Sequence, residues 1–118
     1  MKARIKDMQS VTDLTAEFLG INKPIRIKVK DISGGRANTR TRCISVPKWA
    51  MNNEHYAIYY AVHEVCHYRV SGHGIAFKLI EKNALSQWNI EIEYSRAYPK
   101  SLSCNGQKVY DKKRDKLY

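Results

Sequence analysis

The stretch HEVCHYRVSGHG, residues 63–74, decides how the rest of this 118-residue chain is interpreted. In a helix, residues four positions apart lie one above the other, so His63 and His67 can bind one ion together. Glu64 lies about 100° around the helix axis, within reach of a water on the metal but away from the metal itself. Two imidazoles and a carboxylate in this HExxH pattern predict a zinc hydrolase site that takes a third ligand from elsewhere.

His73 is the preferred third ligand. A continuous helix would place His73 about 9 Å along the axis from His67, too far for a shared ion with bonds of about 2 Å. Gly72 and Gly74 predict a break that lets the chain fold back and present His73 from another direction. The alternative is a carboxylate from the following helix, where Glu81 is the only acid. We expect four site residues: His63, His67 and His73 as ligands of Zn²⁺, and Glu64 as general base.

The helix that carries the motif is expected from about Glu54 to Val70. Its apolar stripe consists of Ile58, Val62 and Val65, with Ala61 and Cys66 at its edges. On a helical wheel that starts at Ile58, the two histidines of the motif fall at about 140° and 180°, and Tyr56 and Tyr60 share that outer face. A histidine of the core would lie on the stripe, so this geometry predicts that the site faces a cleft.

Other residues near the motif are not expected to bind the metal. Cys66 is expected to be a buried thiol rather than a ligand, and His55 an exposed residue at the helix start rather than a fourth ligand. The oxyanion that forms during peptide hydrolysis needs the metal and a further hydrogen-bond donor. Tyr60, Tyr94 and Tyr98 are the candidates for that donor, although a packing role is favoured for each.

Helical spacing of apolar residues predicts two more helices. One covers residues 8–20 and is followed by Pro24, which blocks its continuation; the other covers residues 75–88. The apolar positions at this spacing are Val11, Leu14, Phe18 and Leu19 in the first helix, and Ile75, Ala76, Leu79, Ile80 and Trp88 in the second.

Alternation of apolar and polar residues predicts short strands. PIRIKVK, residues 24–30, and TRCISVP, residues 41–47, are each expected to form one, with Ile44 and Val46 of the second turned inward. The Gly-rich residues 31–40 are expected to form a flexible hairpin loop, since no GxxxxGK pattern marks a nucleotide site.

The C-terminal part has weaker signals. IEIEYS, residues 90–95, predicts a short strand, and Cys104-Asn105-Gly106-Gln107 a tight turn between SLS and KVY. The charged tail, residues 111–118, is expected to fray. The elements together predict an α+β fold with a small antiparallel or mixed sheet. We expect a single domain, residues 1–118, with a core at about 8–95 and a C-terminal hairpin and basic tail at about 96–118.

Composition indicates which class of binding partner and which cellular location to expect. The net charge of +10 and the pI near 9.7 favour anionic partners, of which nucleic acid is the commonest; the alternative is a merely basic protein. Three widely spaced cysteines without a CxxC pair favour a reducing, cytoplasmic location. The N-terminal residues have no secretory pattern, and no apolar run is long enough for a membrane span. The sequence leaves the oligomeric state open.

Residues 63–83, HEVCHYRVSGHGIAFKLIEKN, resemble the SprT-like zinc metallopeptidases. The motif of that family is HExxH on one helix, then a short loop with a third His followed by Gly, then a helix that begins with a Phe two or three residues on. CISVPKWA, residues 43–50, is also similar to that family, and the WLM and YgjP-like groups are similar over roughly the same region, residues 24–90. The resemblance implies a compact zincin-like core that binds zinc through the three histidines, with Glu64 as base.

The resemblance also implies a partner. Members of the family are associated with cleaving proteins attached to or near DNA, which suits the basic charge of this chain. SprT proteins commonly carry a C-terminal zinc ribbon of paired cysteines, whereas here only Cys104 lies in that region. The small size and the missing ribbon suit a minimal bacterial or phage form, which would act in the cytoplasm, that of the host for a phage protein.

The function predicted from these residues is a zinc metallopeptidase that acts on a protein or peptide substrate. The alternative is a basic nucleic-acid-binding protein whose zinc site is structural and catalytically inactive. Structural zinc sites are usually closed and often rich in cysteine, and they have no use for a carboxylate at position 64. The presence of Glu64 therefore favours the enzyme.

Overall fold

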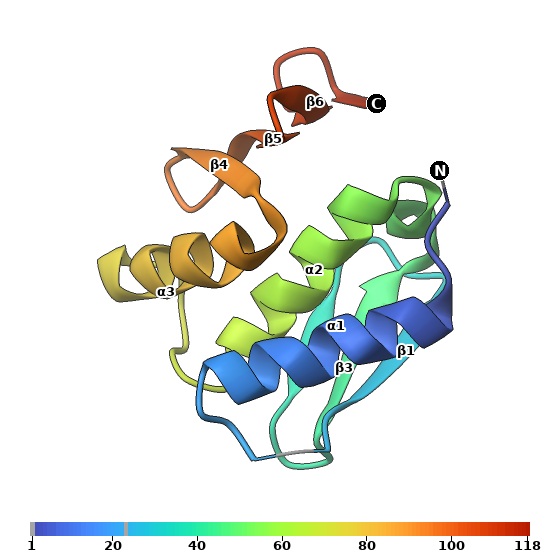
Figure 1. Cartoon of the computed structure of the whole chain (residues 1–118), viewed down its shortest axis with the longest axis vertical. Coiled ribbons are helices and arrows are strands. Elements are labelled where there is room, and N and C mark those ends of the chain that lie inside the picture. The colour runs from blue at the N-terminus through green and yellow to red at the C-terminus, as the bar shows by residue number, and fades with distance from the viewer. Residues whose placement is uncertain (1, 23) are drawn as a thin grey trace.

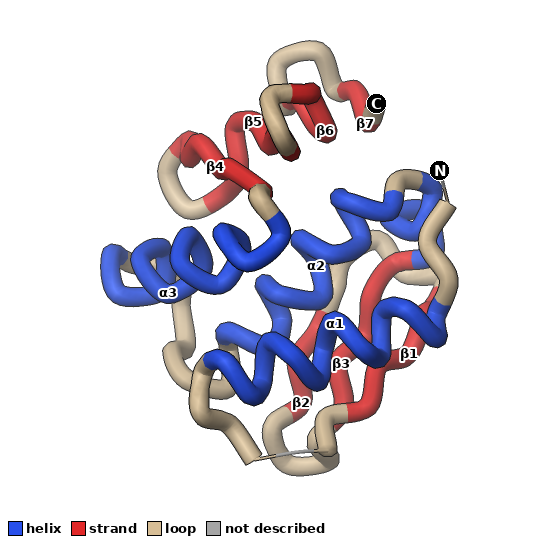
Figure 2. The backbone as a smooth tube through the Cα atoms, viewed as in Figure 1, coloured by secondary structure: helices blue, strands red, loops and turns tan. Residues whose placement is uncertain are grey.

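The helix that carries the motif lies between two separate sheets (Figures 1 and 2). The computed structural model describes residues 2–22 and 24–118. The N-terminal elements are α1 (Ile5–Phe18), β1 (Arg26–Lys30), β2 (Arg36–Asn38), β3 (Cys43–Pro47), a 3₁₀ turn (Lys48–Asn52) and α2 (Glu54–Cys66). The C-terminal elements are α3 (Ile75–Leu85), a 3₁₀ turn (Ser86–Trp88), β4 (Ile90–Ser95), β5 (Tyr98–Cys104), β6 (Gln107–Asp111) and β7 (Lys116–Leu117). This arrangement confirms the predicted α+β class.

The first sheet has the strand order β1-β3-β2 and is mixed. β1 runs parallel to β3, with Ile27 opposite Ile44, whereas β2 pairs antiparallel with β3. Ile44 and Val46 are fully buried under α2, as predicted. The hairpin loop expected at residues 31–40 is wrong: this segment contains β2, because two parallel strands need a connection that crosses over rather than a tight turn.

α1 forms as predicted, but part of its expected apolar stripe is wrong. Leu14 and Phe18 are exposed, and the buried face instead holds Met8, Val11, Thr12, Thr15 and Ala16. The hydroxyl of Thr12 donates to the Met8 carbonyl and that of Thr15 to the Val11 carbonyl, both at 2.8 Å. A threonine whose hydroxyl is bonded within its own helix can be buried without an unsatisfied polar group. The sequence pattern counted only apolar residues, and it therefore indicated the wrong face of the helix.

α3 also exposes residues that its spacing suggested for the core. Ile75 is 79% exposed and Leu79 is exposed too, whereas the buried residues are Phe77, Glu81, Ala84 and Leu85. The helix ends at Leu85, earlier than the expected residue 88. The buried face contains an acid, and this acid hides the true helical period when only apolar residues are counted.

α2 begins at a capping asparagine and ends earlier than predicted. The side chain of Asn53 accepts hydrogen bonds from the backbone N–H groups of His55 and Tyr56. Val62 and Val65 are fully buried, as predicted, and the helix stops at Cys66 rather than at residue 70. None of the helices among the described residues has the length and apolar character that crossing a membrane requires.

The second sheet is antiparallel, with the order β4-β5-β6-β7. The predicted turn between β5 and β6 is confirmed: Asn105 and Gly106 have φ values of 52° and 81°, the positive values that a tight hairpin needs. The prediction of a frayed tail is wrong. β7 pairs with β6, and the Tyr118 carbonyl accepts a hydrogen bond of 2.8 Å from the amide of Asn53.

Replacing the cap of α2 should destabilise the fold. We expect Asn53→Ala to lower the free energy of unfolding by about 1–2 kcal/mol, because it removes the cap and the bond to Tyr118 together. Asn52→Ala, at the exposed neighbouring position, is the matched control and should change it by less than about 0.5 kcal/mol. Urea unfolding measures both, and equal stabilities of the two variants would contradict the capping role.

Candidate functional site

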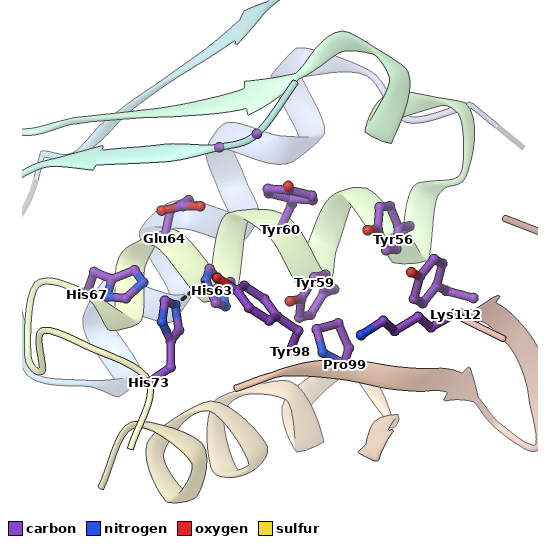
Figure 3. Close-up of a pocket in the computed structure, with 13 residues that line it drawn as sticks. Tyr56, Tyr59, Tyr60, His63, Glu64, His67, His73, Tyr98, Pro99 and Lys112 are labelled. Atoms are coloured by element: carbon purple, nitrogen blue, oxygen red, sulfur yellow. Dashed lines mark hydrogen bonds between the residues drawn. The ribbon is translucent and has the colours of Figure 1, made fainter. Parts of the chain in front are cut away.

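The three histidines of residues 63–74 lie together at the end of α2 (Figure 3). Their ligand atoms are all within 4.8 Å of one another, and among the described residues they form a group of donors that could hold a metal ion. His67 caps the helix, and Gly72 follows in the loop with a φ of +77°, a value that residues with side chains rarely adopt. The expected break is confirmed, and it returns His73 to the other two rings.

The spacing of two of the three donors fits a tetrahedral ion. The Nε2 atoms of His63 and His73 lie 3.3 Å apart. Two nitrogens bound tetrahedrally at about 2.0–2.1 Å from one zinc ion are separated by about 3.3–3.4 Å. The observed separation therefore matches the one that a shared zinc ion requires.

Hydrogen bonds on the far side of two rings orient them. Nδ1 of His63 is 2.5 Å from Oε2 of Glu81, and Nδ1 of His67 is 3.2 Å from the Val70 carbonyl oxygen. An N–H at each Nδ1 satisfies these acceptors and leaves Nε2 as the free lone pair. Such partners behind a histidine are typical of metal sites in proteins.

Phe77 packs beneath all three imidazoles. Its ring centroid lies 5.0 Å from that of His63, 4.5 Å from that of His67 and 5.1 Å from that of His73. Phe77 is itself buried, so all three imidazoles pack against an apolar side chain that is held in the core. Burial lowers the pKa of His67 and of His73, and the neighbouring His63 lowers both further, which favours the neutral form that binds metals.

Glu64 lies beside this group on the cleft side of α2. Its side chain is buried, and this burial raises the pKa of the carboxyl to about 7, against a smaller lowering by His63. Gly35 approaches it closely: a Cβ built at Gly35 would lie 2.6 Å from Oε2 of Glu64 and 2.6 Å from Cε1 of Tyr60. The absence of a side chain at position 35 thus leaves the space that the carboxylate occupies.

Glu81, the alternative third ligand, has a different position. It is 1% exposed, and its second oxygen, Oε1, accepts a hydrogen bond of 2.6 Å from the hydroxyl of Tyr94. Both oxygens are therefore used behind His63, on the side of the ring away from Nε2. Sequence reasoning missed this role, although Glu81 shares a helical face with Phe77 and Leu85, and an acid on an apolar face is a detectable signal.

The three candidate tyrosines occupy different environments. Tyr94 donates to Glu81, and burial together with this bond raises its pKa. Burial raises the pKa of Tyr60, against a smaller lowering by the backbone of Gly35. Tyr98 is 60% exposed, its ring centroid lies 5.8 Å from that of His73, and Figure 3 shows its hydroxyl directed toward the histidines. Tyr98 therefore has a hydroxyl that a bound molecule can reach.

A cleft of about 550 Å³ runs from the histidines along α2. One wall is α2 with Gly34 and Gly35, and the opposite wall comes from the second sheet (Figure 3). Residues that the sequence did not single out line it as well: Gly35, Tyr59, Pro99, Tyr110 and Lys112. Those of the second sheet lie 25 or more residues from the motif in the chain, with no spacing pattern that relates them to it.

The remaining sequence-based expectations concern Cys66 and His55. Cys66 is fully buried, and burial raises the pKa of its thiol, in agreement with the predicted structural role. His55 lies at the start of α2 and lines a separate hollow with Cys104 and Tyr118. It is only partly exposed, and it is not among the donors grouped at the end of the helix.

Comparisons with known proteins identify a solved structure with a similar fold. No protein-family model and no curated protein matches this chain. A solved structure that is similar is the crystal structure of the metallopeptidase zymogen of Pyrococcus abyssi abylysin, with a TM-score of 0.55 and 18% sequence identity. The match covers 67% of this chain and 77% of that one. At this identity the likeness concerns the fold alone, and it supports the predicted zincin-like core.

Proposed function

We propose that this chain is a zinc metallopeptidase that hydrolyses peptide bonds with Glu64 as general base. The observation that carries the proposal is the convergence of His63, His67 and His73 beside a buried carboxylate at one end of an open cleft. Three neutral imidazoles with a free coordination position are the donor set of a catalytic zinc site. The similarity to a metallopeptidase structure supports a protein or peptide substrate.

The proposed mechanism follows from the placement of the side chains. The three histidines would hold zinc, which supplies Lewis acidity that lowers the pKa of water toward about 7 and polarises a carbonyl group. Glu64, whose pKa is raised to about 7 by burial, accepts the proton of the attacking water and delivers it to the leaving amine. Tyr98 donates a hydrogen bond to the oxyanion from the opposite wall.

An open site with a buried base argues against the alternative function. A structural zinc site in a nucleic-acid-binding protein needs no cleft and no carboxylate beside the ligands, because its coordination is closed. The SprT-like resemblance, the DNA-associated substrate, the nucleic-acid partner and the cytoplasmic location stay predictions. Of these, the nucleic-acid partner draws its support from the net charge of +10.

Two substitutions test the site and the base separately. We expect Glu64→Gln to retain one bound zinc while slowing cleavage of labelled, unfolded casein by at least about 100-fold, because the proton acceptor is lost. His73→Ala should lose both zinc and cleavage. Metal analysis and a fluorescence assay measure these quantities, with Glu54→Gln at the other end of α2 as the control. Cleavage by Glu64→Gln at the wild-type rate would refute the base, and undiminished zinc in His73→Ala would refute the ligand.

Removing the hydroxyl of Tyr98 should affect the transition state more than binding. We expect Tyr98→Phe to lower kcat on the order of 10- to 100-fold with a change in KM below about threefold. Steady-state kinetics on a quenched peptide measures both constants. Tyr118→Phe, outside the cleft that contains His63, His67 and His73, is the control and should behave as wild type. A rise in KM at constant kcat would assign Tyr98 to substrate binding instead.

The glycine beside the base should be intolerant of a side chain. Gly35→Ala places a methyl group against Glu64 and Tyr60, so the carboxylate must move. We expect kcat to fall by about 10-fold or more, as a displaced base no longer reaches the water. Gly34→Ala meets no atom within 4 Å and is the matched control. Equal kcat values of the two variants would show that this close approach does not position Glu64.

A further inference from the structure

Glu81 is a buried acid placed directly behind one of the three histidines. α3 brings its side chain into the interior, where the carboxylate meets Nδ1 of His63 at 2.5 Å on one oxygen and the hydroxyl of Tyr94 at 2.6 Å on the other. Ring N–H and phenolic O–H groups are both donors, and a carboxylate with two oxygens accepts from both. The hydrogen-bonding capacity of the three groups is thus matched.

Burying a carboxylate at this position costs free energy that an apolar packing residue would not cost. Burying a carboxylate costs several kcal/mol unless donors satisfy it, whereas an apolar residue of similar size would carry no such penalty. The neighbours of Glu81 on the same face of α3, Phe77 and Leu85, are apolar and buried. An acid at this position therefore suggests a function at His63 rather than a contribution to the core.

We propose that Glu81 is a positioning residue for the metal ligand His63, and that Tyr94 holds Glu81 in place. The proposal rests on the proposed function, since it concerns the same metal site. Glu81 accepts the Nδ1 proton of His63, which fixes the tautomer with its lone pair on Nε2 and fixes the rotation of the ring about its bond to Cβ. The Nε2 atom is then held where it faces that of His73, 3.3 Å away.

Tyr94, in the second sheet, is the third residue of the hydrogen-bonded group that starts at His63 and continues through Glu81. It lies in β4, and its hydroxyl prevents Oε1 of Glu81 from turning away from the site. The ammonium groups of Lys78 and Lys82, on α3, lie 5.1 and 5.8 Å from the centre of the Tyr94 ring, within the range of cation–π attraction. The ring is thus fixed against the same helix that carries Glu81, and its effect on His63 passes through the carboxylate.

Zinc affinity of the full chain tests the positioning role independently of proteolysis. We expect the dissociation constant for zinc, measured by competition with a chromogenic chelator, to rise roughly 10- to 100-fold in Glu81→Ala and less in Glu81→Gln. Glutamine retains one acceptor oxygen for the Nδ1 proton and should rescue part of the affinity. Glu93→Gln, an exposed acid on β4, is the matched control and should bind zinc as wild type.

Cobalt in place of zinc reports on the geometry of the ligands. We expect the visible absorption bands of the Co²⁺-loaded Glu81→Ala chain to shift in position and intensity, because a freed His63 ring binds at a different angle. A loss of packing alone would lower the melting temperature of the metal-free protein without altering these bands. Circular dichroism of each metal-free variant verifies that it is folded.

A double-mutant cycle separates the two positioning residues. Tyr94→Phe alone should weaken zinc binding about 2- to 10-fold, but in the Glu81→Ala background it should change the dissociation constant by less than about twofold. Such non-additivity is expected if Tyr94 acts only through Glu81. Equal effects in both backgrounds would overturn that part of the proposal.

The outcomes distinguish this proposal from the function itself. Zinc affinities and cobalt spectra of the Glu81 variants equal to those of wild type would overturn the positioning role, whatever the peptidase assay shows. Zinc binding that depends on Glu81, in a wild-type chain that cleaves no substrate, would support the positioning role and remove the peptidase. A wild-type chain that binds no zinc would overturn both.

Discussion

The return of the chain between His67 and His73 is the constraint on which the rest of the site depends. α2 has to end at Cys66, since one further turn would carry the following residues away from the two imidazoles of the helix. Gly72 makes the reversal at a φ of +77°, a backbone conformation that residues with side chains rarely adopt and that glycine adopts with little strain. Because α3 begins two residues after His73, the same turn determines where the next helix lies.

The position of α3 then determines what backs the ligands. Phe77 supports the three rings, and Glu81, four residues later on the same face, reaches His63. Through Tyr94 this carboxylate also contacts β4, and the sheet that begins there supplies Tyr98 and the opposite wall of the cleft. The ligands, their supports and the wall that faces a substrate are therefore joined by contiguous contacts.

The sequence predicted those features that a short, local spacing defines. The separation of His63 from His67, and the glycines around His73, were sufficient to anticipate three converging rings. The alternation in residues 24–30 was sufficient for β1. Local spacing does not encode strand order, so the parallel pairing of β1 with β3 was missed. It also misjudged α1, where Thr12 is buried with its hydroxyl bonded within the helix, because polarity was taken as a sign of exposure.

The two acids of the site show why composition alone could not assign their roles. Glu64 and Glu81 are both almost fully buried, and no buried side-chain nitrogen or oxygen among the described residues lacks a partner. Glu81 uses both oxygens in bonds to protein groups and so is held in one orientation. Glu64 instead lines the cleft, where burial raises its pKa to about 7. Because environment rather than residue type separates a fixed acceptor from a group that exchanges protons, one acid is suited to orient a ligand and the other to act as a base.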